Sequence, residues 1–290
     1  MAADSSLTPA ETTTFIAAAR TLLDRIEAQE EGLDAAAAAC ADAIAADGLV
    51  HLFGTGHSRI PVEEMFPRYG SYPGFNPIVE LSMTYHTQVV GSNGQRQAMF
   101  IERMRGLAET ILANFDLRPT DVLTVFSASG VSAVPIEMAL AGRARGLTVI
   151  GVTSVEGSRA AEPHHEAGRL LDVVDLVLDL ATPPGDALVE IYGLDMPVAP
   201  GSTLAAVAIV NEIKARTAAL LVARGAMPPV LTSGALVGAE ESARLFDAAY
   251  AEHARRYARS LNGAETPSAR KEVTPVRAKA HRQDSGGLTN

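Results

Sequence analysis

Apolar and polar positions follow two different rhythms along the chain. Between residues 8 and 47, apolar side chains such as Phe15, Ala19 and Leu22 recur every three or four positions. This spacing predicts two antiparallel helices with a break near residues 31–32. From there to about residue 225, short apolar runs that suit buried strands alternate with runs of helical spacing. Such alternation predicts a parallel sheet covered by helices on both faces.

The pattern divides the chain into three parts. Residues 1–47 are expected to be helices that pack on the domain or on a second subunit, and residues 48–261 to be one ligand-binding domain. The predicted strands of that domain are 49–53, 76–81, 121–129, 147–154 and 176–180. One predicted helix begins near Ser58, a second covers 95–115 and a third ends at Arg145. A fourth follows Pro200, and a fifth covers 239–261. Residues 262–290 are polar and basic without apolar spacing, which predicts a disordered tail.

Composition and charge narrow the classes of function. With 290 residues, of which 47% are apolar, the chain can bury a sizeable core, as a soluble globular protein does. Its net charge of −10 argues against a nucleic-acid partner, because binding the phosphate backbone needs a basic face. The sequence shows no membrane-spanning stretch and no signal-peptide pattern. We therefore expect a cytoplasmic protein without a membrane partner.

Cysteine and histidine positions do not favour metal chemistry. Cys40 is the only cysteine, which excludes an intramolecular disulfide and a thiolate metal cluster. His164 and His165 are adjacent and lack the i, i+4 spacing that aims two helical ligands at one ion. We expect neither a metal nor another cofactor.

Two turns rich in small and hydroxyl residues carry the candidate chemistry. Residues 54–58 (GTGHS) follow the first predicted strand, and residues 127–132 (SASGVS) follow the third. Backbone N–H groups and hydroxyls at a strand-to-helix turn can hold an anion, and parallel sheets bind ligands at the carboxyl ends of their strands. Neither turn matches the dinucleotide fingerprint or the nucleotide P-loop. Together they predict a different phosphorylated ligand.

On these residues the sequence resembles the SIS, or sugar isomerase, domain family, whose members bind phosphorylated sugars. The resemblance rests on GTGHS at 54–58, FSASG at 126–130 and ARGLTVIGVTS at 144–154. It is strongest to the small single-domain branch that contains phosphoheptose isomerases and N-acetylmuramic acid 6-phosphate etherases. It implies a three-layer α-β-α sandwich with a five-stranded parallel sheet. It also implies a homodimer or homotetramer.

The resemblance implies a set of substrate-binding residues. The serines of the second turn would hold the sugar phosphate, the first turn would line the sugar, and residues 199–203 would close over the ligand. The residues are Gly56, Ser58, Ser127, Ser129, Gly130, Ser132, Ser202 and Thr203. From the residues alone, Ser132 could instead serve only as a helix N-cap.

Three residues are candidates for acid–base chemistry. By resemblance, Glu64 matches the position of the acid–base carboxylate in the isomerases and etherases; the alternative is an exposed helix charge. His57 lies inside the first turn, where a neutral imidazole could assist ring opening or only donate a hydrogen bond. His86 could reach the site of its own or a neighbouring subunit, or be an ordinary surface or core histidine.

One departure from the family bears on the reaction. In the heptose isomerases the last long helix carries a histidine that serves as the second base, and here residues 211–214 read NEIK. Lys214 is expected to be solvated or salt-bridged, although a desolvated lysine could act as a base. Proton abstraction at C2 is therefore better supported than a shuttle between two carbons.

These observations together predict an enzyme of sugar phosphate metabolism. Glu64 would remove the C2 proton of an opened hexose 6-phosphate, and the C3 substituent would leave. The resemblance to the etherases, and no particular residue, makes an N-acetylamino sugar such as N-acetylglucosamine 6-phosphate the preferred substrate. The protein would then be a carbon–oxygen lyase or dehydratase. The alternatives are an aldose–ketose isomerase and a non-catalytic sugar phosphate sensor.

Overall fold

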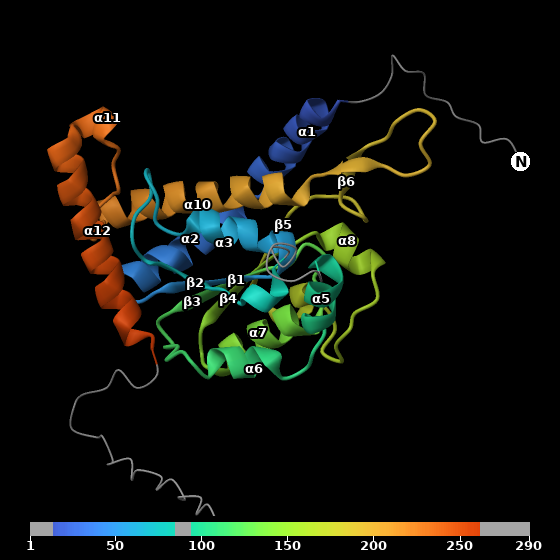
Figure 1. The fold of residues 1–290 in the computed structure, drawn as a ribbon, viewed down its shortest axis with the longest axis horizontal. Coiled ribbons are helices and arrows are strands. Elements are labelled where there is room, and N and C mark those ends of the chain that lie inside the picture. The colour runs from blue at the N-terminus through green and yellow to red at the C-terminus, as the bar shows by residue number, and fades with distance from the viewer. Residues whose placement is uncertain (1–13, 85–93, 262–290) are drawn as a thin grey trace, which may run out of the picture.

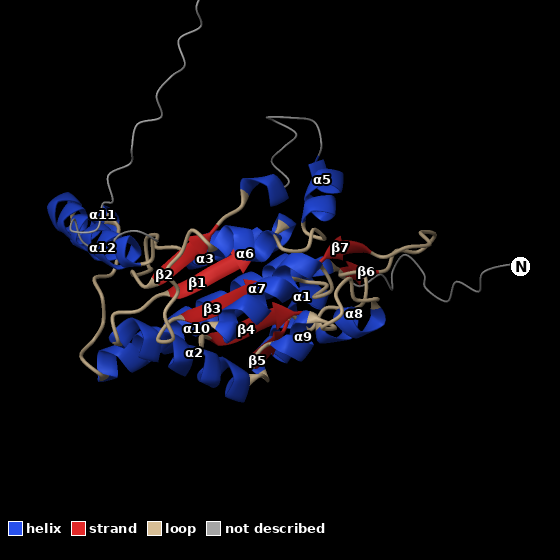
Figure 2. Cartoon of the chain, turned by 90° about the horizontal axis from the view of Figure 1, so that it is seen from below, coloured by secondary structure: helices blue, strands red, loops and turns tan. Residues whose placement is uncertain are grey.

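A five-stranded parallel sheet lies at the centre of the computed structural model, which describes residues 14–84 and 94–261. The strand order is β2 (Phe75–Ile78), β1 (Val50–Gly54), β3 (Val122–Phe126), β4 (Thr148–Thr153) and β5 (Leu176–Asp179). Val50 of β1 pairs with Phe75 on one side and with Val122 on the other. Every residue of β1 and β3 is buried, as in strands covered on both faces. The predicted parallel sheet is therefore confirmed (Figure 2).

Helices cover both faces of the sheet (Figure 1). On one face lie α1 (Phe15–Glu27), α2 (Glu30–Ala45), α3 (Ile60–Met65) and α10 (Ser202–Ala223). On the other face lie α5 (Gly94–Ile101), α6 (Leu107–Leu112), α7 (Ala133–Ala144) and α9 (Leu170–Val173). Successive side chains of β3 enter opposite cores, with Val122 in the first and Leu123 in the second. The expected three-layer α-β-α sandwich is confirmed.

The N-terminal helices share one core with the sheet and α10. The small side chains of α2, such as Ala36 and Ala41, are fully buried, and small residues allow two helices to approach closely. Thr217 of α10 donates a 3.3 Å hydrogen bond to the carbonyl of Ala37. Cys40 lies in the same interface, where burial raises the pKa of its thiol to about 12.

The remaining elements lie at the strand ends and beyond α10. They are the 3₁₀ turns η1 (Gly56–Arg59) and η2 (Leu81–Met83), helix α8 (Val155–Ala160), the antiparallel pair β6 (Ala187–Val189) and β7 (Val198–Pro200), and helices α11 (Gly234–Val237) and α12 (Ala239–Arg259). Helix α12 confirms the helix predicted over 239–261. The β6–β7 pair was not predicted, because three-residue strands are too short to show a periodicity. The predicted tail at 262–290 lies outside the described residues.

The structure corrects the helix predicted over residues 95–115. The chain leaves α5 after Ile101 and begins α6 only at Leu107. Gly106 precedes α6 with a φ of +80°, a left-handed conformation that favours glycine, and its N–H donates to the Glu137 carboxylate at 2.8 Å. Apolar periodicity runs through this break, so the pattern alone indicated one helix.

The break between the first two helices lies at residues 28–29 and not at the predicted 31–32. Gln29 is held there by a contact with β5, far away in the sequence. Its side-chain amide donates to the carbonyl of Asp179 at 2.8 Å and accepts from the N–H of Asp179 at 2.8 Å. A local pattern could not reveal this partner.

A buried polar network closes the amino-terminal edge of the sheet. Asp121 accepts hydrogen bonds from the backbone N–H groups of Leu49 at 2.9 Å and Arg118 at 3.0 Å, and its Oδ2 lies 3.2 Å from His51 Nε2. The other ring nitrogen of His51 lies 3.0 Å from the Asn76 amide. Burial alone would raise the pKa of Asp121, but these hydrogen bonds outweigh burial and hold the pKa below its usual value.

Candidate functional site

The first turn closes tightly because residue 54 is a glycine. A Cβ at Gly54 would lie 2.2 Å from the carbonyl oxygen of Ser58, so the chain can fold back into η1 only without a side chain at this position. Ser58 in turn binds the second turn, since its Oγ accepts a 3.4 Å hydrogen bond from the N–H of Ala128. The two turns therefore meet at the carboxyl ends of β1 and β3.

The second turn also requires a glycine. Gly130 has a φ of +63°, and a Cβ there would lie 2.6 Å from Thr153 Oγ1 and 2.9 Å from Ser158 Oγ. The N–H of Gly130 donates to Ser127 Oγ at 3.2 Å. This bond holds Ser127 at the end of β3, with its side chain toward a cavity.

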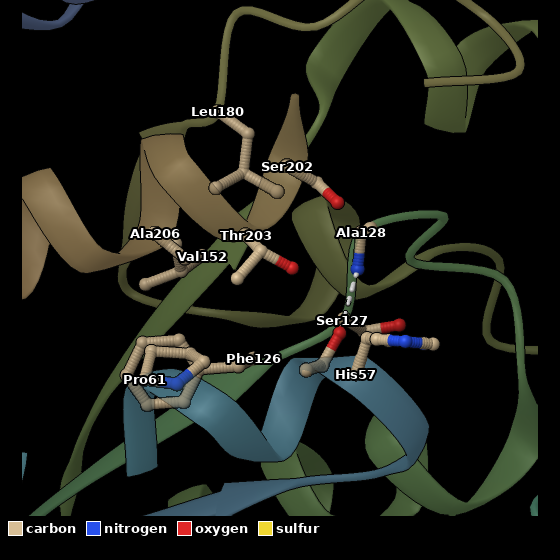
Figure 3. A pocket seen from close by; sticks show the side chains of 11 residues that line it. His57, Pro61, Phe126, Ser127, Ala128, Val152, Leu180, Ser202, Thr203 and Ala206 are labelled. Carbon is tan, nitrogen blue, oxygen red and sulfur yellow. Dashed lines mark hydrogen bonds between the residues drawn. The ribbon is translucent and has the colours of Figure 1, made fainter. Parts of the chain in front are cut away.

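A small cavity opens between the two turns and the start of α10 (Figure 3). Its polar lining consists of His57, Ser58, Ser127, Ser202 and Thr203. The remaining lining is largely apolar, from residues of α3, β3, β4 and α10. The cavity is small, with about 10 Å³ open to the centre of a water-sized sphere, which is roughly the room that one water molecule needs. Ligand pockets commonly enclose roughly 300–1,000 Å³, so a bound ligand must lie mostly outside this space.

Four serine hydroxyls at and beside the cavity fall into two groups. Ser58 and Ser127 each accept a hydrogen bond from a backbone N–H, and neither hydroxyl donates one to another described residue. Ser132 donates to a carboxylate oxygen of Glu102 at 2.9 Å, and Ser202 donates to Asp186 at 2.5 Å. Because a hydroxyl has a single hydrogen, only the first group can donate to a ligand without breaking a bond shown here.

Asp186 fixes the start of α10. Besides Ser202 Oγ, its carboxylate accepts the backbone N–H groups of Ser202 at 2.7 Å and Gly201 at 3.2 Å. A carboxylate at this position satisfies helix N–H groups that would otherwise lack a partner and interacts favourably with the helix dipole. Since Asp186 lies just before β6, the β6–β7 pair is joined to one wall of the cavity.

The structure brings a further carboxylate to the two turns, which the sequence did not indicate. Glu102 lies in the break after α5, where its carboxylate accepts hydrogen bonds from Thr55 at 2.7 Å and from Ser132 at 2.9 Å. Its backbone carbonyl accepts the N–H of Val134 in α7 at 2.9 Å. Gly106, which permits the break, was the only local signal that the helix does not continue.

Glu64 lies on α3, one turn beyond the cavity-lining Pro61. Its carboxylate does not line the cavity. It accepts a hydrogen bond from Arg68 at 2.7 Å and one from the Asn211 amide of α10 at 3.3 Å, and its side chain is 21% exposed. The neighbouring Glu63 is 60% exposed and pairs with Arg59 at 3.3 Å.

Lys214 of α10 is both buried and paired. Its ammonium donates to the backbone carbonyl of Glu64 at 2.9 Å and lies 3.9 Å from the Glu64 carboxylate. Burial lowers the pKa of Lys214, the Glu64 charge opposes this shift, and the pKa stays below its usual value. The sequence predicted a solvated or salt-bridged lysine, with a desolvated lysine as the alternative; in the structure Lys214 is both desolvated and paired with Glu64.

The candidate residues fall into three groups in the structure. Five of them line the cavity, as given above. Gly56, Ser129, Gly130 and Ser132 belong to the same two turns but do not line it. Glu64 lies one helical turn away on α3, and His86 is outside the described residues.

Within residues 14–84 and 94–261, no three His, Cys, Asp or Glu side chains come together as metal ligands would. No helix in these ranges is long and apolar enough to cross a membrane.

Comparison with known proteins identifies relatives. A family model described as the SIS domain matches residues 14–154. A UPF0309 protein of Geobacillus thermodenitrificans is 37% identical over 225 residues, which cover 77% of this chain and 88% of the relative. A UPF0309 protein of Streptomyces coelicolor is 35% identical over 229 residues, which cover 78% and 90%.

Solved structures with a related course of the chain were also found. The phosphoheptose isomerase of Neisseria gonorrhoeae is 18% identical with a TM-score of 0.43, and the match covers 71% of this chain and 94% of that one. A phosphoheptose isomerase of Francisella tularensis is 15% identical with a TM-score of 0.45, and the match covers 70% and 94%.

Proposed function

The chain belongs to the SIS domain family, and on that premise we propose that it is an enzyme that binds a sugar phosphate in the cavity between the two turns. The observation that carries the proposal is the pair of hydroxyls of Ser58 and Ser127. Each is held by a backbone N–H bond that leaves its hydrogen free for a ligand oxygen. Two such donors beside a helix start suit a phosphate group.

The size of the cavity limits what it can hold. With room for about one water-sized sphere it cannot hold a whole hexose 6-phosphate, so we place a phosphate oxygen there and the sugar outside, beside His57. Residues one turn apart on a helix are about 5–6 Å apart, so Glu64 lies close to the cavity-lining Pro61.

We propose Glu64 as the base that takes the C2 proton of the opened sugar. Loss of that proton leaves an electron pair that forms the C2–C3 double bond while the C3 substituent departs and takes up a proton. With a C3 hydroxyl the products are water and an unsaturated sugar phosphate. His57 on the cavity rim is placed to move protons during ring opening.

Isomerisation is the second candidate reaction, and the position of Lys214 favours it. This side chain lies 3.9 Å from the Glu64 carboxylate, and burial lowers its pKa, so it is a possible second proton carrier. In that reaction the proton taken from C2 is returned to C1, and the C3 substituent stays. For the elimination, an N-acetylamino hexose 6-phosphate remains the substrate class that we propose first, by likeness to the etherases, whereas isomerisation to a ketose requires a hydroxyl at C2. We propose a cytoplasmic location for the enzyme.

A proton NMR time course in deuterated buffer separates these reactions. The purified protein is incubated with a panel of hexose and N-acetylhexosamine 6-phosphates. Glu64→Gln is the test variant, and Glu63→Gln is the matched control because Glu63 is a largely exposed neighbour on the same helix. Deuterium at C2 with a new vinylic signal supports elimination, whereas exchange with ketose formation supports isomerisation.

The same experiment can reject the proposal. If Glu64 is the base, the exchange of the C2 proton for deuterium must be lost in Glu64→Gln and kept in Glu63→Gln. If no proton exchanges in the wild type while saturation transfer still shows bound sugar phosphate, the enzyme proposal fails and a sensor takes its place. If no sugar phosphate binds, the binding proposal fails as well.

A further inference from the structure

The carboxylate of Glu102 accepts the hydroxyl hydrogens of both turns. Thr55 belongs to the first turn and donates to it at 2.7 Å, and Ser132 ends the second turn and donates at 2.9 Å. A carboxylate can only accept, so the direction of both bonds is fixed while it is ionised. Bonds to a charged acceptor are stronger than bonds between neutral groups.

This arrangement conflicts with phosphate binding by Ser132. A hydroxyl that donates to Glu102 presents only its lone pairs to other groups, and lone pairs do not bind phosphate oxygens. A phosphate dianion at the second turn would also lie near the negatively charged carboxylate of Glu102, and repulsion between the two would weaken phosphate binding. Ser132 can therefore bind phosphate only after it has left Glu102.

We propose that Glu102 is a positioning residue that holds the hydroxyls of Thr55 and Ser132 in the free protein and releases Ser132 when the phosphate binds at the second turn. The proposal rests on the proposed function, in which the second turn holds a phosphate. In the free protein the carboxylate ties the two turns together and stabilises them. Binding transfers the hydrogen of Ser132 from Glu102 to the phosphate, so part of the binding free energy is spent on breaking that bond.

A distinct combination of effects follows for Glu102→Gln. The glutamine amide can still accept one hydroxyl but carries no charge, and its NH₂ cannot accept the second hydroxyl. The free protein should unfold at a lower temperature than the wild type. Phosphate should nevertheless bind about tenfold more tightly, because the competing acceptor is neutral and weaker and the like charge is gone.

Calorimetric titration and thermal unfolding of the full chain test this combination. The probes are inorganic phosphate and N-acetylglucosamine 6-phosphate. Glu137→Gln is the matched control, since Glu137 accepts the N–H of Gly106 in the same region without contacting either turn. Glu102→Ala provides a second variant without any side-chain acceptor. The double variant Glu102→Gln/Ser132→Ala shows whether the gain in affinity depends on Ser132.

Each outcome decides the matter. A lower unfolding temperature with tighter phosphate binding in both Glu102 variants, reduced in the double variant and absent in Glu137→Gln, supports the proposal. Equal or weaker binding in the Glu102 variants, while the wild type binds the sugar phosphate, overturns it and leaves the proposed function in place. If neither wild type nor variants bind either probe, the proposed function and this inference fail together.

Discussion

Replacing Gly54 by alanine should disturb the cavity from a position that does not line it. The added Cβ would lie 2.2 Å from the Ser58 carbonyl oxygen, and real Cβ contacts essentially never fall below 3.0 Å. The Ser58 backbone must therefore move from 2.2 to at least 3.0 Å, which weakens the bond between Ser58 Oγ and the Ala128 N–H. Forced overpacking costs about 1–3 kcal/mol, and the upper half applies because backbone must move.

The effect can be measured by thermal unfolding and by titration with a sugar phosphate. A loss of about 2–3 kcal/mol corresponds to a decrease in Tm of roughly 4–12 °C for a chain of this size. Sugar phosphate binding should weaken about tenfold, because the Ser58 hydroxyl, one of the proposed phosphate donors, is displaced. Gly234→Ala is the control, since a Cβ there meets nothing closer than 3.5 Å. If Gly54→Ala matches the wild type in both Tm and affinity, the close approach in the first turn does not exist.

Three further predictions concern charges and burial. Asp121→Asn should destabilise the fold by about 1.5–3 kcal/mol in urea unfolding at pH 7. Because the pKa of Asp121 is lowered in the folded state, this advantage of the wild type is present above pH ~4 and should shrink as the pH falls below it; a constant difference down to pH 2 would contradict the reasoning. Cys40 should resist alkylation at pH 8 in the native protein and react only on unfolding, because its thiol is buried with a pKa of about 12; rapid native labelling would show that α2 is not packed as described. Asp186→Ala should cost about 1 kcal/mol and speed amide exchange at Ser202, and unchanged exchange would mean that Asp186 does not cap α10.

Much of the fold was predictable because its signals are local. Strands β1 and β3 are buried on both faces and their sequences are mostly apolar, interrupted only by His51 in β1 and Thr124 in β3. Helix α10 repeats buried residues such as Ile209 and Ile213 at helical spacing. The break at Gln29 was misplaced because its partner, Asp179, is 150 positions away in the sequence.

The candidate site was predictable only in part. Parallel strands end at the same edge of a sheet, so the two turns could be expected to meet, and they do. The start of α10 as a third wall came from family resemblance and not from the residue pattern. Glu102 was missed because it lies within a helical pattern, and only the long-range contacts to Thr55 and Ser132 reveal its position.

If the cavity binds the phosphate of a sugar phosphate, the Ser127 hydroxyl must contribute to binding, and calorimetric titration of Ser127→Ala measures that contribution. N-acetylglucosamine 6-phosphate and unphosphorylated N-acetylglucosamine are titrated into the wild type and the variant. The wild type should bind only the phosphorylated sugar, and the variant should lose about tenfold or more in affinity, since one charge-assisted hydrogen bond is removed. Equal affinity for both sugars, or unchanged binding by Ser127→Ala, would contradict it.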